Sequence, residues 1–148
     1  MAKQFIYPFT FGDKSKSDLL GGKGANLAEM VQMGLPVPPG FTITTDACRE
    51  YLTTGNVPAQ LDDQINTALT NLEKVVEKKF GDAKNPLLVS IRSGAKHSMP
   101  GMMETVLNVG ITPEVADAMA KSSGNERFAW DSYRRFIEIG RASCRERV

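Results

Sequence analysis

Hydrophobic and polar positions alternate along the chain at two different periods, which predicts an α+β fold. Short runs of β-branched and aromatic residues, bounded by glycine or proline, predict strands around Phe5, Thr42, Val89 and Val106. Longer stretches repeat their apolar positions every three or four residues and predict helices at 25–33, 58–79, 112–121 and 126–137. We expect the strands to form one mixed sheet with the helices packed around it.

Individual residues mark the ends and the buried faces of these helices. Gly34 is expected to end the first helix, and Thr45 or Asp46 to cap a short helix that follows. Thr112 is expected to cap the helix that begins at Pro113. The side chains predicted to face the core are Leu27, Met30 and Val31 in the first helix and Phe128, Trp130, Tyr133 and Phe136 in the last.

The composition of the 148 residues is typical of a globular domain with little net charge. Eighteen basic and 17 acidic residues leave a formal charge of +1, so no bulk electrostatic field favours nucleic acid or an anionic membrane as a partner. No apolar run is long enough to span a bilayer. The two cysteines form no pattern, which favours a reducing compartment, cytoplasmic or organellar, and we expect the cytoplasm.

Two of the predicted strands flank a loop whose composition suits an anion. Within residues 93–103, Gly94 and Gly101 can adopt the positive φ that turns backbone N–H groups toward a phosphate. Arg92, Lys96 and His97 can add positive charge at the mouth of this loop. The pattern favours a phosphate-cradling loop for a nucleotide, and an ordinary surface hairpin with one paired arginine is the alternative.

A second candidate phosphate ligand is Lys23, which lies among three glycines at 21, 22 and 24. A glycine-rich entry to a helix offers unpaired N–H groups and the positive end of the helix dipole. A lysine there would act as a point charge on the same phosphate. The alternative is a solvated lysine beside a flexible helix start.

The last eleven residues, EIGRASCRERV from Glu138 to Val148, abandon the pattern of the preceding helix. They resemble the in-frame translation of a sequencing-library adapter, so we expect residues 138–148 to be a non-native tail and residues 1–137 to be the domain. The alternative is a basic tail that binds a partner.

Three segments resemble the N-terminal region of the pyruvate, phosphate dikinase family: GGKGANLAEMVQMGLPVPPGFTITTDAC (21–48), VSIRSGAKHSMPGMMETVLNVG (89–110) and FAWDSYRRFI (128–137). The likeness covers residues 2–137. The related phosphoenolpyruvate synthases, which use water in place of phosphate, carry a loop closer to RSSATAEDLP, so the loop of this chain favours the phosphate-using enzymes.

The resemblance implies the first part of an ATP-grasp-type nucleotide-binding domain. Members of the family convert ATP, pyruvate and phosphate to AMP, phosphoenolpyruvate and diphosphate with Mg²⁺. Their N-terminal domain phosphorylates a histidine on a swivelling domain, which carries the phosphoryl group to a pyruvate-binding barrel. Carried onto this sequence, the resemblance assigns ATP and phosphate binding to Lys23, Arg92, Gly94, Lys96, Gly101, Met103 and Thr105.

The same resemblance assigns no catalytic residue to this chain. The carrier histidine, the acidic Mg²⁺ ligands and the pyruvate barrel fall outside the matching region, so His97 is not the carrier. Cys48 has no apparent His or Asp partner and is not expected to be a nucleophile. We expect the chain alone to be inactive in the whole reaction and to bind ATP weakly or not at all. The competing interpretation is a non-catalytic module that binds a nucleotide or another chain.

Overall fold

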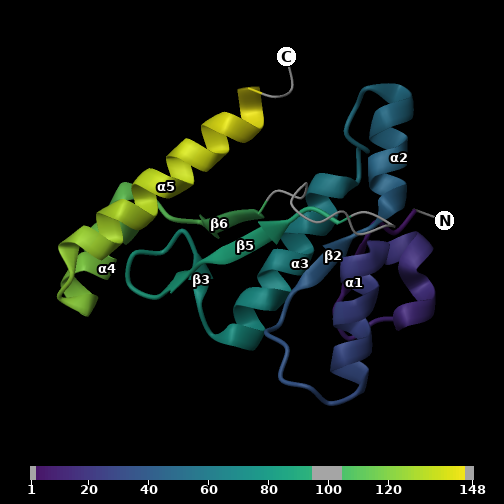
Figure 1. Ribbon diagram of the computed structural model, residues 1–148, viewed down its shortest axis with the longest axis horizontal. Coiled ribbons are helices and arrows are strands. Elements are labelled where there is room, and N and C mark those ends of the chain that lie inside the picture. The colour runs from purple at the N-terminus through teal and green to yellow at the C-terminus, as the bar shows by residue number, and fades with distance from the viewer. Residues whose placement is uncertain (1–2, 95–104, 146–148) are drawn as a thin grey trace. The chain divides into compact units, whose positions relative to one another are not determined.

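The computed structural model describes residues 3–94 and 105–145, and the chain divides into two compact units (Figure 1). The first unit comprises residues 1–76 and 94–101, and the second comprises residues 77–93 and 102–148. Helices and short strands occur in both units, which confirms the α+β class.

The first unit contains two strands, a 3₁₀ turn and three helices. Its elements are β1 (Ile6–Pro8), η1 (Lys14–Lys16), α1 (Ser17–Gln32), β2 (Phe41–Ile43), α2 (Thr45–Thr54) and α3 (Leu61–Val76). The second unit contains β3 (Lys79–Phe80), β4 (Pro86–Leu87), β5 (Val89–Arg92), β6 (Thr105–Val109), α4 (Pro113–Ser123) and α5 (Glu126–Arg145).

The expectation of one mixed sheet is wrong for the described residues. The strands form three separate two-stranded sheets: β1–β2 antiparallel, β3–β4 parallel and β5–β6 antiparallel. Each strand has only two to five residues, and so short a pair depends on packing against helices for its stability. The expected hairpin around the glycine-rich loop is confirmed by the pairing of β5 with β6.

The core of the first unit forms where β1 meets α3. Phe5 and Ile6 are buried with Ala47 of α2, and Leu61, Ile65 and Ala68 of α3 pack against them. Gln64 of α3 fixes the start of β1, because its side chain accepts a hydrogen bond from Phe5 N at 2.7 Å and donates one to Lys3 O at 2.8 Å. This ties α3 to the sheet through polar as well as apolar contacts.

The buried face of α1 is not the one that the apolar pattern predicted. Met30 is exposed and Leu27 and Val31 are only half-buried, whereas Leu20, Gly21, Gly24, Ala25 and Ala28 are buried. At Gly24 this face touches β2, and a larger side chain would not fit there. The expected end of the helix is confirmed, since Gly34 has φ 76° and its N–H bonds to Val31 O in a Schellman arrangement.

The start of α2 differs from its prediction. Thr44, and not Thr45 or Asp46, is the N-cap residue, and its side chain makes no capping hydrogen bond. The Thr45 hydroxyl donates to Asp18 O at 2.5 Å instead, which connects α2 to the start of α1.

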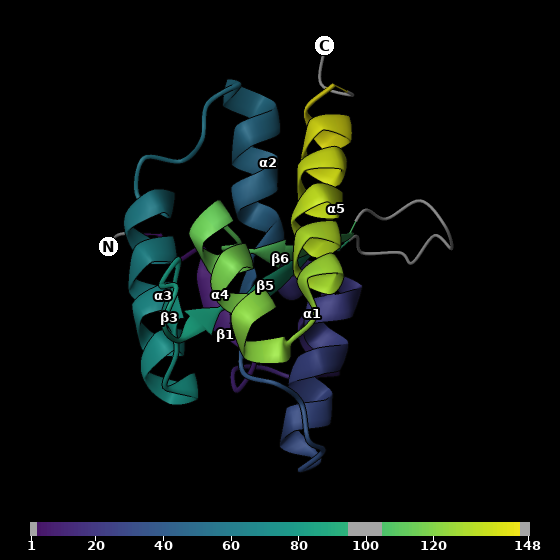
Figure 2. The ribbon, with the colours of Figure 1, turned by 90° about the vertical axis from the view of Figure 1, so that its left-hand side faces the viewer.

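In the second unit, α4 and α5 pack side by side and α5 also contacts β6 (Figures 1 and 2). Thr112 caps α4 as predicted, its hydroxyl accepting from Val115 N at 3.2 Å. Ile111, Val115 and Ala116 form the core, and Tyr133 and Phe136 of α5 pack against it. The other two aromatic side chains of α5 were wrongly placed in the core by the sequence pattern, because Phe128 is 54% and Trp130 37% exposed.

Helix α5 also runs past its predicted end. It continues through residues 138–145, and Glu138 accepts hydrogen bonds from Arg134 at 2.6 and 2.7 Å. This pair joins the last turn of the predicted helix to Glu138, the first residue of the segment that is predicted to be a non-native tail.

Candidate functional site

Lys23 lies just after a break in α1. Gly21 has φ 71° and ψ 164°, which is far from helical and divides α1 into two helical parts. These angles fall in a region that only glycine adopts without strain. Lys23 therefore lies in the first turn of the second part, where backbone N–H groups lack the regular helical partner and the helix dipole is positive. The predicted glycine-rich helix entry is present, although α1 as a whole begins earlier, at Ser17.

The residue after Lys23 is in close contact with β2. A Cβ atom added to Gly24 would lie 2.9 Å from Thr42 Cγ2, 3.0 Å from Thr42 Oγ1 and 3.2 Å from Leu20 Cβ. Real Cβ atoms essentially never lie within 3.0 Å of another heavy atom, so a side chain at this position requires a shift of its neighbours. The turn that carries Lys23 is thereby seated directly on β2.

Gly94, at the start of the glycine-rich loop, belongs to the same unit as Lys23. A Cβ atom added to Gly94 would lie 3.9 Å from Lys23 Cβ, which is an ordinary van der Waals contact. Two of the seven predicted ligand residues are therefore neighbours. The aliphatic base of Lys23 therefore lies close to the backbone of Gly94.

Arg92 and Thr105 lie in the second unit, at the loop end of the β5–β6 hairpin. They pair directly across the two strands, and the register is irregular between Val89 and Ile91. Arg92 is exposed and Thr105 is half-buried. Arg92 and Thr105 thus lie near the two ends of the loop segment. Lys96, Gly101 and Met103, as well as His97, lie outside the described residues.

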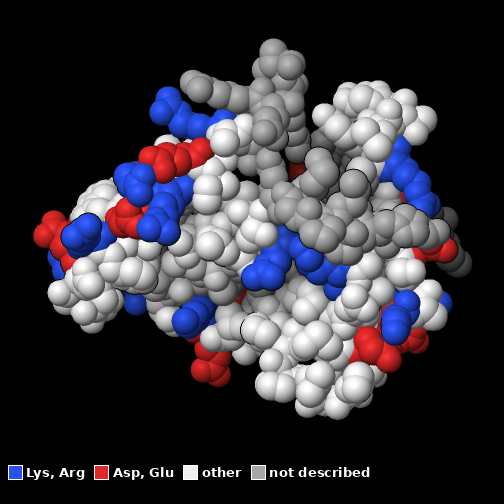
Figure 3. Space-filling model, viewed as in Figure 1, with Lys and Arg blue, Asp and Glu red and all other residues white. Residues whose placement is uncertain are grey.

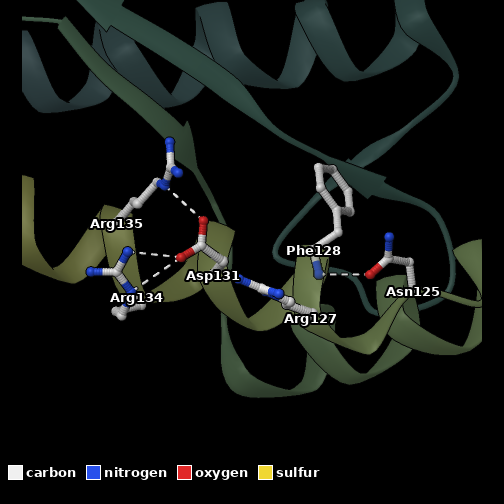
Figure 4. Close-up of a pocket in the computed structure, with 6 residues that line it drawn as sticks. All are labelled: Asn125, Arg127, Phe128, Asp131, Arg134 and Arg135. Carbon is white, nitrogen blue, oxygen red and sulfur yellow. Dashed lines mark hydrogen bonds and ion pairs between the residues drawn. The ribbon is translucent and has the colours of Figure 1, made fainter.

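A surface pocket of about 530 Å³ lies on α5 and on the turn before it (Figure 4). Its lining residues are Asn125, Arg127, Phe128, Asp131, Arg134 and Arg135. None of these is a predicted ligand residue. Acidic and basic side chains are interleaved on this part of the surface (Figure 3).

Two arginines of this pocket, Arg134 and Arg135, are already paired with acidic side chains. Asp131 accepts from Arg134 Nη2 at 2.7 Å and forms an ion pair with Arg135 Nε at 2.7 Å. The hydrogen bond from Arg134, helped by the charge of Arg135, lowers the pKa of the Asp131 carboxyl below its usual value. Hydrogen bonds to Asp131 and Glu138 raise the pKa of Arg134. We interpret this network as a stabilising feature of the helix surface.

Other classes of site find little support in the described residues. Cys48 is exposed and carries no disulfide. No group of three or more His, Cys, Asp or Glu side chains lies close enough there to hold a metal ion. Among the helices described, none has both the length and the apolar character needed to cross a membrane.

The sequence alone identified Gly21 and Gly24 only as parts of a glycine-rich helix entry, and it did not identify Thr42. The signal was the run Gly-Gly-Lys-Gly, because so many glycines in one helix entry imply that several backbone positions are constrained. The contact with Thr42 had no signal in the sequence, since it depends on how α1 and β2 meet.

Comparisons with known proteins agree with the resemblance seen in the motifs. The family model for the pyruvate phosphate dikinase AMP/ATP-binding domain matches residues 17–74 and 55–132. The chain is 54% identical over 140 residues to a pyruvate, phosphate dikinase of Clostridium symbiosum, covering 94% of this chain and 16% of the relative. It is 50% identical over 137 residues to one from Entamoeba histolytica, covering 92% and 16%. It is 56% identical over 128 residues to pyruvate, phosphate dikinase 2 of Oryza sativa, covering 86% and 14%.

The chain therefore spans only about a sixth of the length of these relatives. The family match nevertheless extends over most of its residues and includes the turn of Lys23 and the β5–β6 hairpin. This chain belongs to the pyruvate phosphate dikinase AMP/ATP-binding domain family.

Proposed function

We propose that the chain supplies phosphate-binding residues for ATP in a pyruvate, phosphate dikinase. The observation that carries this proposal is the turn of Lys23, which follows the break at Gly21 and lies against Gly94 of the loop. A cation, a helix start and a bare glycine backbone together make a suitable environment for a phosphate group.

Each proposed ligand has a distinct role. Lys23 acts as a point charge on a phosphate, and Arg92 offers a planar fork that can hold two phosphate oxygens at once. Gly94 and Gly101 give backbone N–H groups access to the phosphates, and Lys96 adds charge. Met103 and Thr105 complete the loop that covers the nucleotide. The work of these residues is binding and electrostatic stabilisation, and the phosphoryl acceptor is a histidine on another domain.

Further parts of the proposal rest on the family and on the sequence. They are an ATP-grasp architecture, a cytoplasmic location, and pyruvate, phosphate and the phosphohistidine domain as partners. Mg²⁺ is expected for the whole reaction, but the described residues offer no acidic cluster for it, so we assign no step to the metal. We also propose residues 1–137 as the domain and residues 138–148 as a non-native tail.

The 148-residue chain alone should make no phosphoenolpyruvate from ATP, phosphate and pyruvate, which an enzyme-coupled assay would check.

The location of the site can be tested by titrating ATP into the ¹⁵N-labelled chain and following its amide resonances. We expect the largest shifts at Gly22, Lys23, Gly24 and Gly94, because their N–H groups would meet the phosphates. Amides of α5 from Arg127 to Arg135 should move little. Largest shifts at α5 would contradict the proposal and assign the nucleotide to the arginine-lined pocket.

A further inference from the structure

Gly24, the residue that follows Lys23, brings the backbone of α1 into close contact with β2. A Cβ atom there would lie 2.9 Å from Thr42 Cγ2 and 3.0 Å from Thr42 Oγ1. Thr42 has no long flexible end that could move aside, because a β-branched side chain is stiff at χ1. Its backbone is held in β2 opposite Tyr7 of β1.

The surroundings of Gly24 prevent the helix from shifting without cost. Ala25 and Ala28 follow it on the same face, are fully buried and form one apolar cluster with Leu20. Tyr7 and Leu19 pack against this cluster. A side chain at position 24 would meet Thr42 on one side and Leu20 Cβ, at 3.2 Å, on another. The turn that carries Lys23 would then have to lift from β2.

We propose that Gly24 and Thr42 are positioning residues for Lys23. Gly24 lets the first turn after the break rest on the Thr42 side chain, and this contact holds Lys23 beside Gly94. The inference rests on the proposed function in one respect, since that proposal supplies the role of Lys23 as a phosphate ligand. Neither Gly24 nor Thr42 was among the predicted ligands, and both act through the lysine.

The placement of Lys23 can be measured without a ligand. One α-hydrogen of Gly94 points where a Cβ would lie, 3.9 Å from Lys23 Cβ, so the wild-type chain should show a nuclear Overhauser effect between this hydrogen and the Lys23 β-hydrogens. In Gly24→Ala this signal should be lost or strongly weakened. ATP affinity should fall roughly tenfold, because displacements of about 1 Å in a positioned group have large effects.

A second substitution should repair the first. Thr42→Ala removes the two Thr42 atoms that a Cβ at position 24 would meet and leaves only Leu20 Cβ at 3.2 Å, so Gly24→Ala/Thr42→Ala should recover the nuclear Overhauser effect and most of the ATP affinity. Gly140→Ala is the matched control, because it adds a Cβ to a helical glycine with no heavy atom within 4 Å. The control should leave both measurements unchanged.

The outcomes separate this inference from the proposed function. If Gly24→Ala keeps the Lys23–Gly94 signal, or if the double variant fails to restore it, the inference is wrong. If Gly24→Ala does not fold, the double variant must fold and show the signal, and its failure to do so also overturns the inference. If the signal is lost and restored as expected while Lys23→Ala binds ATP as tightly as the wild-type chain, the positioning role stands and the proposed function fails.

Discussion

Gly21 carries the most demanding backbone conformation of α1. Its angles, φ 71° and ψ 164°, interrupt the helix, and the residue is buried. Gly24 of the same site is constrained in a different way, because a side chain there would have no space, whereas its φ is not positive. Two nearby glycines are therefore needed at the turn of Lys23 for different physical reasons. A substitution at Gly21 should strain the backbone, whereas one at Gly24 should cause a steric clash.

We expect Gly21→Ala to lower the free energy of unfolding by about 1–3 kcal/mol, because a residue with Cβ is strained at these angles. No substitution at Thr42 should repair it, in contrast to Gly24→Ala. Urea denaturation of Gly21→Ala with and without Thr42→Ala checks both statements. Recovery of stability in this double variant would mean that the constraint at Gly21 is steric contact with β2.

At the start of α4, Thr112 accepts a hydrogen bond from Val115 N, so its removal should be measurable. We expect Thr112→Ala to cost about 1 kcal/mol of unfolding free energy, and Thr112→Ser to cost much less because the hydroxyl is kept. Urea denaturation of the two variants provides the comparison. Equal losses would indicate that the methyl group of Thr112, and not its capping bond, carries the effect.

At the scale of elements, the sequence predicted most helices and the hairpin but not how they meet. Helix α4 was predicted well because Thr112 and Pro113 mark its start chemically. The buried face of α1 was not, because the contact of Gly24 with β2 buries a side of the helix that carries small residues and leaves Met30 exposed. Likewise, the aromatic pattern of α5 could not show that Phe128 and Trp130 stay exposed. Local sequence signals predict where a helix or strand forms, whereas the side that it buries depends on the elements that pack against it.

The charge network of α5 predicts a pH effect on stability. The pKa of Asp131 is lowered in the folded chain, mainly by its hydrogen bond with Arg134, relative to an ordinary value of 3.8. Its contribution is therefore present above about pH 3.8 and is lost as the pH falls through the lower folded pKa. Asp13 and Glu114 have lowered pKa values as well and act in the same direction.

Asp131→Asn tests this contribution. We expect its midpoint of thermal unfolding to lie below that of the wild-type chain at neutral pH, and the gap to shrink in strong acid, where the wild-type carboxyl is protonated. Because the pair is exposed, the gap should also narrow in high salt. A gap that stays constant from neutral to strongly acidic pH would show that the network contributes nothing through its charge.

At the scale of the whole molecule, the candidate ligands are divided between two units. Lys23 and Gly94 belong to the first, and Arg92 and Thr105 belong to the second. The sequence motifs brought these residues together only through the family resemblance, since nothing in their spacing of about 70 residues along the chain predicts proximity. What the described structure adds is a specific arrangement in the first unit, in which the lysine, the broken helix and the loop glycine are neighbours.

We propose that Lys23 and Arg92 bind the phosphates of ATP, and the most direct test is ATP affinity measured on the full chain and two charge-removing variants. Each charge-assisted contact contributes about 1.5–3 kcal/mol, so Lys23→Ala and Arg92→Ala should each weaken binding roughly tenfold or more. The exposed residues Lys74 of α3 and Arg127 of α5 provide matched controls, and their alanine variants should bind as the wild-type chain does. No binding by a folded wild-type chain would mean that the site forms only together with the rest of the enzyme, whereas equal, measurable affinity in all five proteins would contradict the proposal.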